Sequence, residues 1–210
     1  MTLVQYDLPE WLDVSRETQA KLESLLTLVA KWNRTINLVS AGSLADGWRR
    51  HILDSAQILP LSGLDSGRWV DIGSGAGFPG LVVAILAQDY RPDLRVALVE
   101  SDRRKATFLS EASRQLGLTV DVMCSRVEAL PDLQASIISA RALAPLNKLL
   151  GDARRHLRAD GLCLFMKGQN YRTEITDAQW NWTFDLEVIS SLVEPEAVIL
   201  KVREILDAKS

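Results

Sequence analysis

The chain has 210 residues, of which 47% are hydrophobic and 24% are charged, and its formal net charge is −3. These values suit one well-buried domain with a small extension and exclude wholesale disorder. The first ten residues lack a basic segment followed by an apolar core, and no apolar run approaches the roughly 20 residues of a membrane span. We therefore expect a cytoplasmic protein that has no membrane partner.

The first third of the chain has a helical pattern. Ser15 can cap a helix whose apolar positions recur at helical spacing: Leu22, Leu25, Leu26, Val29 and Trp32. A second helix is expected to open at Ser43 and to end at Pro60, because proline cannot continue a helix interior. We assign residues 1–65 to an N-terminal helical extension.

From about residue 68 the pattern changes to an alternation of strands and helices. The expected strands cover residues 68–72, 95–100, 118–124, 136–140 and 162–167. Helices are expected over residues 79–88, 102–116 and 145–158, and residues 182–190 and 197–202 resemble a closing antiparallel hairpin. This alternation predicts an α/β domain over residues 66–210, with a Rossmann-like, doubly wound parallel sheet.

A glycine-rich turn follows the first expected strand. Residues 71–80 read Asp-Ile-Gly-Ser-Gly-Ala-Gly-Phe-Pro-Gly, with glycines at alternate positions Gly73, Gly75 and Gly77. Without a Cβ, these residues let the backbone bend tightly and approach a ligand closely. The helix that follows offers free N–H groups at its start. The turn therefore predicts a site for a nucleotide-like cofactor.

Two classes of cofactor fit such a turn. Residues 75–80 satisfy the dinucleotide fingerprint, and Glu100 lies about where a ribose-binding acid would stand. However, Pro79 removes an N–H that a pyrophosphate would use, and only 210 − 80 = 130 residues remain for the rest of a dehydrogenase. S-adenosylmethionine has no phosphate, and its ammonium group can be attracted by an acid near the turn, such as Asp71. These features favour S-adenosylmethionine over a dinucleotide.

Polar residues follow each of the five expected strands. They are Gly73, Glu100, Arg126 with Glu128, Arg141, and Lys167 with Gly168. In an open α/β sheet, ligands bind beyond the carboxyl ends of the strands, so we expect one composite site. The Glu100 carboxylate can accept hydrogen bonds from both ribose hydroxyls, or it serves only as the acid before the next helix. Val127 and Glu128 would lie beside the adenine, unless Glu128 is only a helix-start acid.

The charges are unevenly distributed along the chain. Residues 141–172 contain seven Lys or Arg and two Asp, a balance of 7 − 2 = +5, whereas residues 173–200 contain six acids and no base. The basic stretch is either a solvated helix face or a phosphate-binding surface. His156 lies in this stretch and is expected to be solvated. Cys124 and Cys163 are expected to be buried and reduced, because their spacing fits neither a disulfide framework nor a metal site.

Seven segments of the chain resemble a known family. They are Lys-Trp-Asn-Arg-Thr-Ile-Asn-Leu-Val-Ser at 31–40, Arg-His-Ile-Leu-Asp-Ser at 50–55, the turn at 71–80, Glu-Ser-Asp-Arg-Arg-Lys at 100–105, Ser-Arg-Val-Glu at 125–128, Ala-Arg-Ala-Leu-Ala-Pro-Leu at 140–146, and Lys-Gly at 167–168. Many methyltransferases share the glycine turn, but its Phe-Pro-Gly ending together with the 50–55 segment is far more specific. The chain resembles, from about residue 20 to 205, the bacterial 16S ribosomal RNA guanine-N7 methyltransferases, also called glucose-inhibited division protein B.

The resemblance implies a class I S-adenosylmethionine-dependent methyltransferase fold with a helical N-terminal extension. It implies transfer of a methyl group to N7 of a guanosine in the decoding region of 16S rRNA; the alternative is another RNA or a non-RNA acceptor. The positions that match the family's cofactor contacts are Gly73, Phe78, Val127, Glu128 and Arg141. Arg141 would also stand near the methyl group and the incoming base.

Guanine N7 has a lone pair and no proton, so its methylation needs no general base. Catalysis would come from alignment of the reacting atoms and from exclusion of water. We expect Arg49, Arg50, His51, Arg126 and Lys167 to contact the RNA, with a second basic cluster at 103–105. The expected partner is 16S rRNA, free, in an assembly intermediate or in the small subunit, bound by a monomer that holds no metal.

Overall fold

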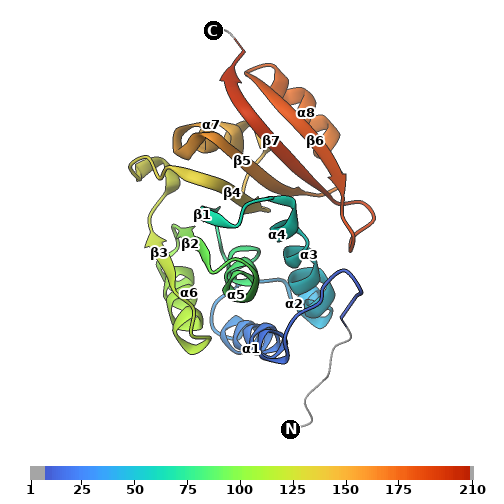
Figure 1. Ribbon diagram of the computed structural model, residues 1–210, viewed down its shortest axis with the longest axis vertical. Coiled ribbons are helices and arrows are strands. Elements are labelled where there is room, and N and C mark those ends of the chain that lie inside the picture. Colours follow the sequence, from blue (N-terminus) through green and yellow to red (C-terminus); the bar gives the residue numbers. More distant parts are fainter. Residues whose placement is uncertain (1–7, 209–210) are drawn as a thin grey trace.

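The computed structural model describes residues 8–208, which form a three-layer α/β/α arrangement around one mixed sheet (Figure 1). The strand order is β3-β2-β1-β4-β5-β7-β6. Strands β1 to β5 run parallel, whereas β7 is antiparallel to both β5 and β6. The strands are β1 (Ser66–Ile72), β2 (Asp93–Glu100), β3 (Val120–Cys124), β4 (Ala135–Arg141), β5 (Leu157–Lys167), β6 (Trp182–Ser190) and β7 (Val198–Asp207).

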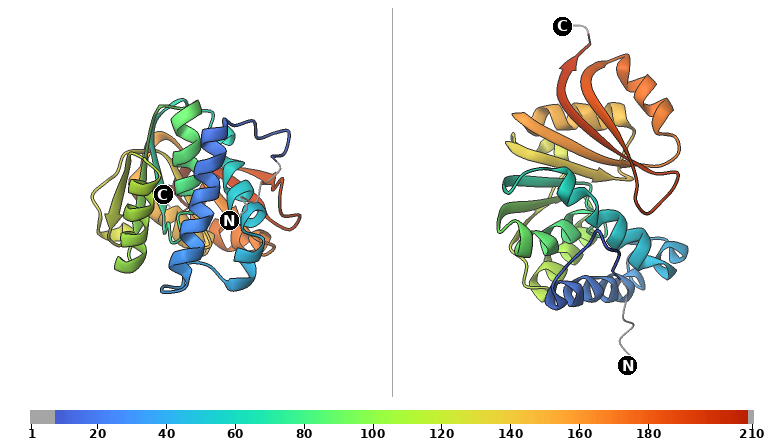
Figure 2. Two further views of the ribbon diagram at one scale, coloured as in Figure 1. Left: turned by 90° about the horizontal axis from the view of Figure 1, so that it is seen from below. Right: turned by 45° about the vertical axis from the view of Figure 1, so that its right-hand side comes forward.

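Helices cover both faces of the sheet. Seven of them are α1 (Arg16–Asn33), α2 (Ala41–Ala45), α3 (Asp54–Ala56), α4 (Ile58–Leu61), α5 (Gly80–Tyr90), α6 (Arg103–Gln115) and α7 (Leu146–His156). The others in the described part are α8 (Tyr171–Gln179), the π-helix η1 (Trp48–Leu53) and the 3₁₀ turn η2 (Val127–Ala129). Helices α5 and α6 lie on one face with α1 packed against them, and α7 and α8 lie on the other (Figures 1 and 2). No helix within residues 8–208 is both long and apolar enough to cross a membrane.

Alternate residues of the central strands are buried in two apolar cores, one on each face of the sheet. Trp69 of β1 is buried on the side of α1 and α5, and its neighbour Val70 is buried on the side of α7. In β5, Leu164 and Phe165 divide in the same way. A strand buried on both faces reads as a continuous apolar run, which is how these segments were recognised in the sequence. The doubly wound parallel sheet and the closing antiparallel hairpin are confirmed.

The N-terminal region differs from the prediction in one helix. Ser15 caps α1 as expected, because its side chain accepts a hydrogen bond from Thr18 N. The expected single helix from Ser43 to Pro60 is wrong: Ser40 caps a helix that starts at Ala41, and the segment breaks into α2, η1, α3 and α4. Pro60 lies inside the short α4, where the first turn requires no N–H. The division at residue 65 remains a prediction.

Two further expectations are wrong. His156 is fully buried rather than solvated, and its Nε2 lies 3.0 Å from the carbonyl oxygen of Val127. Cys163 is buried as expected, but Cys124 is exposed; both are free thiols. Residues 171–179 form helix α8, which the sequence analysis did not predict.

Candidate functional site

The glycine turn leaves β1 in a conformation that favours glycine. Gly73 has φ +66°, and an added Cβ would lie 2.4 Å from Leu143 Cδ1. Gly77 has φ +87°, and an added Cβ would lie 2.4 Å from Leu81 Cδ1. A side chain at either position would meet both backbone strain and a clash. The turn therefore brings bare backbone to the carboxyl end of the sheet, as predicted.

Glu100 ties this turn to the end of β2. Its Oε2 accepts a hydrogen bond from Gly75 N at 2.8 Å, and its Oε1 accepts one from Asp102 N at 2.7 Å. Each carboxylate oxygen has two lone pairs, so one acceptor position on each oxygen remains for a ligand hydroxyl. Both of the roles considered for Glu100 are therefore compatible with its geometry.

Asp71, near the end of β1, supports the turn from the protein interior. It is fully buried, and its Oδ1 accepts a hydrogen bond from Ser139 Oγ at 2.6 Å while its Oδ2 accepts one from Gly80 N at 3.3 Å. Burial raises the pKa of this carboxyl group to about 6. The carboxylate faces the protein interior, so it holds the turn in place and presents no surface to a ligand.

A small hollow of about 120 Å³ lies beside the turn, at the carboxyl ends of β1, β2 and β3. Its lining includes Gly73, Val99, Arg126, Val127, Glu128 and Leu143. Glu128 lies within 2.5 Å of Lys148 Nζ, and this ion pair lowers the pKa of the Glu128 carboxyl group. The predicted neighbours Gly73, Val127 and Glu128 thus meet around one space.

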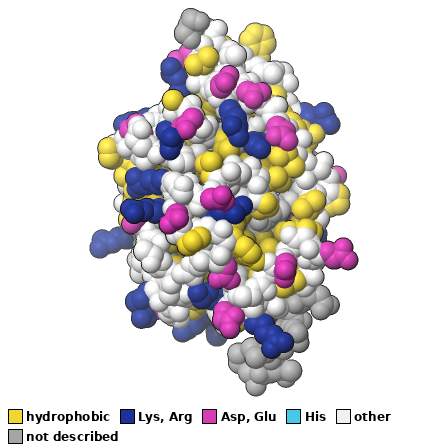
Figure 3. Space-filling view, in the orientation of Figure 1, with side chains coloured by type: hydrophobic (Ala, Val, Ile, Leu, Met, Phe, Trp, Pro, Cys, Tyr) yellow, Lys and Arg dark blue, Asp and Glu magenta, His cyan; other side chains and the backbone are white. Residues whose placement is uncertain are grey.

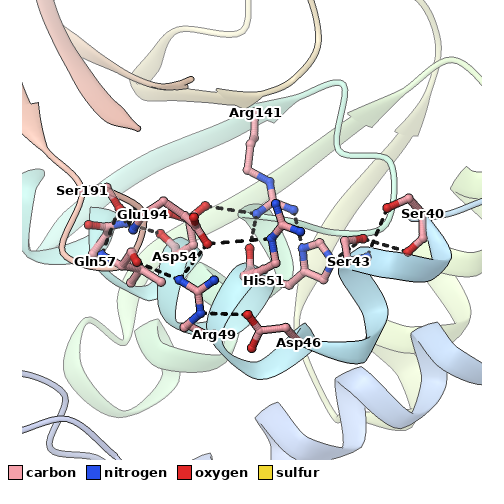
Figure 4. Close-up of polar contacts among 12 residues, drawn as sticks. Ser40, Ser43, Asp46, Arg49, His51, Asp54, Gln57, Arg141, Ser191 and Glu194 are labelled. Carbon is pink, nitrogen blue, oxygen red and sulfur yellow. Dashed lines mark hydrogen bonds and ion pairs between the residues drawn. The ribbon is translucent and has the colours of Figure 1, made fainter. Parts of the chain in front are cut away.

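Arg141 at the end of β4 is held by groups from the N-terminal helices (Figure 4). Its Nη1 donates to the Arg50 carbonyl oxygen at 2.9 Å and to Asp54 Oδ2 at 3.2 Å, and its Nη2 lies 2.7 Å from His51 Nδ1. The guanidinium carbon also stands 5.4 Å from the centre of the Phe78 ring. The Arg141 side chain therefore has a fixed orientation at the edge of the sheet.

The protonation state of His51 follows from these partners. A guanidinium only donates hydrogen bonds, so His51 Nδ1 must accept, and Nε2 carries the proton toward Ser43 Oγ at 3.2 Å. The imidazole is 5% exposed and stacks on Phe78, with ring centres 4.7 Å apart and planes inclined by 11°. Burial and the Arg141 charge lower its pKa to about 4. His51 is therefore neutral near pH 7.

A large hollow of about 410 Å³ lies next to the small one, over the ends of β4, β5 and β7. Its charged lining residues are Asp54, Arg141, Lys167 and Glu174. Leu143 and Ala144 line both hollows. Lys167 Nζ donates to the Ala144 carbonyl oxygen at 2.7 Å and to Glu174 Oε2 at 2.6 Å, and its side chain is 8% exposed.

The predicted RNA-contacting residues occupy different surroundings. Arg49 pairs with Asp46 at 2.8 Å and with Glu194 at 2.9 Å, and Arg50 Nε lies 3.8 Å from Glu194. Arg126 is exposed beside the small hollow. His51 and Lys167 point inward to the partners described above. The structure also brings in residues that sequence reasoning missed: Asp54, Gln57, Glu174 and Ser191. Asp54 could have been found from the sequence, because it belongs to the 50–55 segment.

The fold is that of class I S-adenosylmethionine-dependent methyltransferases. A SAM-dependent methyltransferase from Aquifex aeolicus superposes with a TM-score of 0.58 at 15% identity, covering 84% of this chain and 96% of that one. The M. jannaschii TYW2 structure, a complex with AdoMet, gives a TM-score of 0.55 at 14% identity and covers 83% and 79% of the two chains. At these identities the likeness concerns the fold.

The family is established by sequence. Residues 18–200 match the family model described as "rRNA small subunit methyltransferase G". Two Cereibacter sphaeroides proteins of that name are 48% and 50% identical to this chain over 192 and 194 residues, covering 91% and 92% of it and 93% of each relative. A Jannaschia protein of that name is 46% identical over 94% of both chains. The chain belongs to the rRNA small subunit methyltransferase G family, as its motifs predicted.

Proposed function

We propose that this chain transfers the methyl group of S-adenosylmethionine to N7 of a guanosine in the decoding region of 16S rRNA. The family match over residues 18–200 carries the proposal, since relatives that share nearly half of their residues with this chain are named for small-subunit rRNA methylation. The site described above supports it with a glycine turn, an apolar hollow beside that turn and a fixed cation at one edge of the sheet.

The residues around the glycine turn fit this cofactor. Gly73 lines the small hollow with bare backbone, and a Cβ there would meet the Leu143 side chain, which lines the same hollow. Val99 and Val127 give the hollow apolar walls suited to an adenine ring, and Glu100 at the end of β2 retains acceptor positions for ribose hydroxyls. When bound, S-adenosylmethionine supplies a sulfonium-linked methyl group that a nucleophile can attack.

Guanine N7 attacks through a lone pair that carries no proton, so the protein's task is to align and to shield. The Arg141 guanidinium can stack on a base or donate to its O6. His51 and Asp54 keep it in place from the N-terminal helices. In this proposal residues 1–65 supply that support, and residues 66–210 bind the methyl donor. We also propose Arg126 and the 103–105 cluster as phosphate contacts.

Methylation of ribosomal particles tests the proposal. The purified protein is incubated with labelled S-adenosylmethionine and with 30S subunits that lack the modification, and free 16S rRNA is run in parallel. The labelled base is then mapped. We expect one labelled guanosine in the decoding region, with the methyl group on N7. Label at another atom, in another region, or in ribosomal protein would contradict the proposal.

A further inference from the structure

The large hollow lies over the half of the rim next to the small hollow. Strand order β3-β2-β1-β4-β5-β7 puts the small hollow over β1, β2 and β3, and the large hollow over β4, β5 and β7. The two spaces meet at Leu143 and Ala144, which line both. A molecule in the large hollow would therefore lie directly beside a ligand in the small one.

The lining of the large hollow suits a flat, polar-edged ring. Its apolar walls come from Leu143, Pro145, Met166, Val198 and Ile199. Its volume of about 410 Å³ lies within the range of ligand sites, roughly 300–1,000 Å³. Charged groups stand at two places: Arg141 with Asp54 at the end of β4, and Lys167 with Glu174 beyond the end of β5.

Glu174 has one oxygen in use and one available. Its Oε2 accepts hydrogen bonds from Lys167 Nζ at 2.6 Å and from Leu146 N, at the start of α7, at 2.7 Å. Within residues 8–208, no hydrogen bond reaches its Oε1. The side chain is 26% exposed and lines the hollow. Because a carboxylate only accepts hydrogen bonds, Oε1 calls for a ligand that donates.

The β6–β7 side of the large hollow is held in place by the N-terminal helices (Figure 4). Ser191 and Ala197, at the two ends of the β6–β7 loop, line the hollow. Gln57 donates to Ser191 Oγ at 3.0 Å and accepts from Leu192 N at 2.8 Å, and Arg49 donates to the Val193 carbonyl oxygen at 2.9 Å. The hollow is thus formed by fixed elements.

We infer that the large hollow receives the flipped acceptor guanine and that Glu174 Oε1 reads its Watson–Crick edge, accepting from N1–H and the N2 amine. This inference rests on the function proposed above. Enzymes that act on a base extrude it from its stack and read that edge in a pocket. On the guanine ring, N1 and N2 lie opposite N7. Fixing them at the β5 end of the hollow therefore directs N7 toward β1 and the methyl donor.

Asp54 is less suited to this role. Its Oδ2 receives Arg141 Nη1, and its Oδ1 accepts from Gln57 Nε2 at 2.9 Å and from Ser191 Oγ at 3.4 Å. It also stands at the β4 end, beside Arg141, where the N7 and O6 edge would lie. Asp54 positions Arg141, and Glu174 is the residue that determines specificity.

A single-atom change in the substrate tests the inference with the wild-type protein. 30S subunits are assembled on 16S rRNA ligated to carry one inosine at the mapped position, and inosine lacks only the N2 amine. We expect kcat/KM to fall by about 10- to 100-fold relative to guanosine, the effect of losing one hydrogen bond to a charged acceptor. Equal rates on the two substrates would overturn the inference and leave the proposed function standing. Absence of transfer to guanosine would overturn the proposed function itself.

The Glu174→Gln variant, assayed on both the guanosine and the inosine substrate, tests the role of the carboxylate itself. Its carbonyl oxygen must keep the donors Lys167 and Leu146 N, so its amide N–H groups face the hollow and oppose the donors of guanine. We expect at least about a ten-fold loss on guanosine and a guanosine-to-inosine ratio near one. Asp177→Asn, an exposed change on the same helix, should keep the wild-type ratio. Calorimetry with S-adenosylhomocysteine and a thermal melt check the fold. A wild-type ratio in a folded Glu174→Gln variant would overturn the role of Glu174.

Discussion

The contact between Arg141 and His51 depends on a neutral ring. The 2.7 Å approach of Nη2 to Nδ1 requires an unprotonated acceptor, and the buried stacking on Phe78 disfavours charge. The ring therefore acts as a hydrogen-bond acceptor for Arg141 and as a flat spacer between Arg141 and the surrounding helices.

Two substitutions of His51 distinguish its role as a hydrogen-bond acceptor from its role as a stacked ring. His51→Phe keeps a flat ring over Phe78 but leaves Arg141 Nη2 without its acceptor, so we expect kcat/KM for 30S methylation to fall by about 10- to 100-fold. His51→Asn places an amide oxygen where Nδ1 was and should recover most of that loss. Affinity for S-adenosylhomocysteine, measured by calorimetry, should change little in either variant. Near-wild-type activity in His51→Phe together with a loss in His51→Asn would show that the stacked ring, and not the acceptor, is what matters.

Two buried groups make opposite contributions to the pH dependence of stability. The pKa of His51 is lowered from 6.5 to about 4, so the unfolded chain binds an extra proton between those values and stability falls as the pH falls through them. The pKa of Asp71 is raised from 3.8 to about 6, so the folded chain holds the extra proton and stability falls as the pH rises from 3.8 to 6. In the wild type the two effects largely offset each other between pH 4 and 6.

His51→Phe removes one of these two effects. On acidification from pH 7 to 4.5, the unfolding free energy of the variant should rise relative to the wild type by about 2 kcal/mol, because the variant no longer loses the His51 contribution. Urea unfolding at the two pH values measures this difference. A difference that stays constant with pH would mean that His51 has an ordinary pKa in the folded protein.

At the scale of elements, the loop between β6 and β7 is hydrogen-bonded to Gln57, which lies between α3 and α4. Gln57 is 3% exposed and bonds both Asp54 and the loop residues Ser191 and Leu192. It therefore connects the support of Arg141 to the wall of the large hollow. One buried amide thus links the N-terminal helices to the C-terminal hairpin.

Gln57→Ala tests this connection. Loss of the buried amide leaves Leu192 N without its acceptor and Asp54 Oδ1 with only the longer hydrogen bond from Ser191 Oγ, so we expect a loss of stability of about 2–3 kcal/mol in urea unfolding. The KM for 30S subunits should rise while affinity for S-adenosylhomocysteine stays near the wild-type value, because the small hollow is not touched. Gln179→Ala, an exposed change on α8, should stay within about 0.5 kcal/mol. A cofactor affinity that fell together with 30S binding would contradict a role confined to the wall.

The sequence predicted the elements whose signals are local. The strands of the parallel sheet are continuous apolar runs, and Ser15 and Asp102 cap helices with their own side chains. Helix α8 was missed because only Ala178 of its residues is buried, so no apolar stripe marks it. The π-helix η1 was missed because its 48–53 segment reads as an ordinary helix.

The candidate site was predictable in part for the same reason. The glycine turn and the strand ends were found because topology alone gathers them at one rim. The partners of Arg141 were not found, because His51 and Asp54 are separated from it by about 90 residues and meet it only through tertiary packing. His156 was misjudged because the basic residues beside it suggested solvent, while its partner Val127 lies 29 residues away.

At the scale of the whole molecule, the surface is mixed in charge, and Lys and Arg are numerous on the left of the face in Figure 3, where β3 and α6 lie. Arg103 and Arg126 are exposed on that side of the rim, and neither forms an ion pair within residues 8–208. Arg49, by contrast, is already paired with Asp46 and Glu194. Unpaired cations near the small hollow are the better candidates for releasing counterions from RNA.

Salt dependence distinguishes these two groups of arginines. Each phosphate contact contributes about 0.7–0.9 to the slope of log affinity against log salt, so Arg103→Gln with Arg126→Gln should reduce the slope for 30S binding by about 1.5. Arg49→Gln should leave it nearly unchanged, because the internal acids already neutralise that charge. The slope is measured by filter binding of 30S subunits at salt concentrations from about 50 to about 200 mM. A reduced slope for Arg49→Gln would support the sequence-based assignment of Arg49 to the RNA-binding surface. An unchanged slope for the double variant would show that the β3 side of the molecule does not belong to that surface.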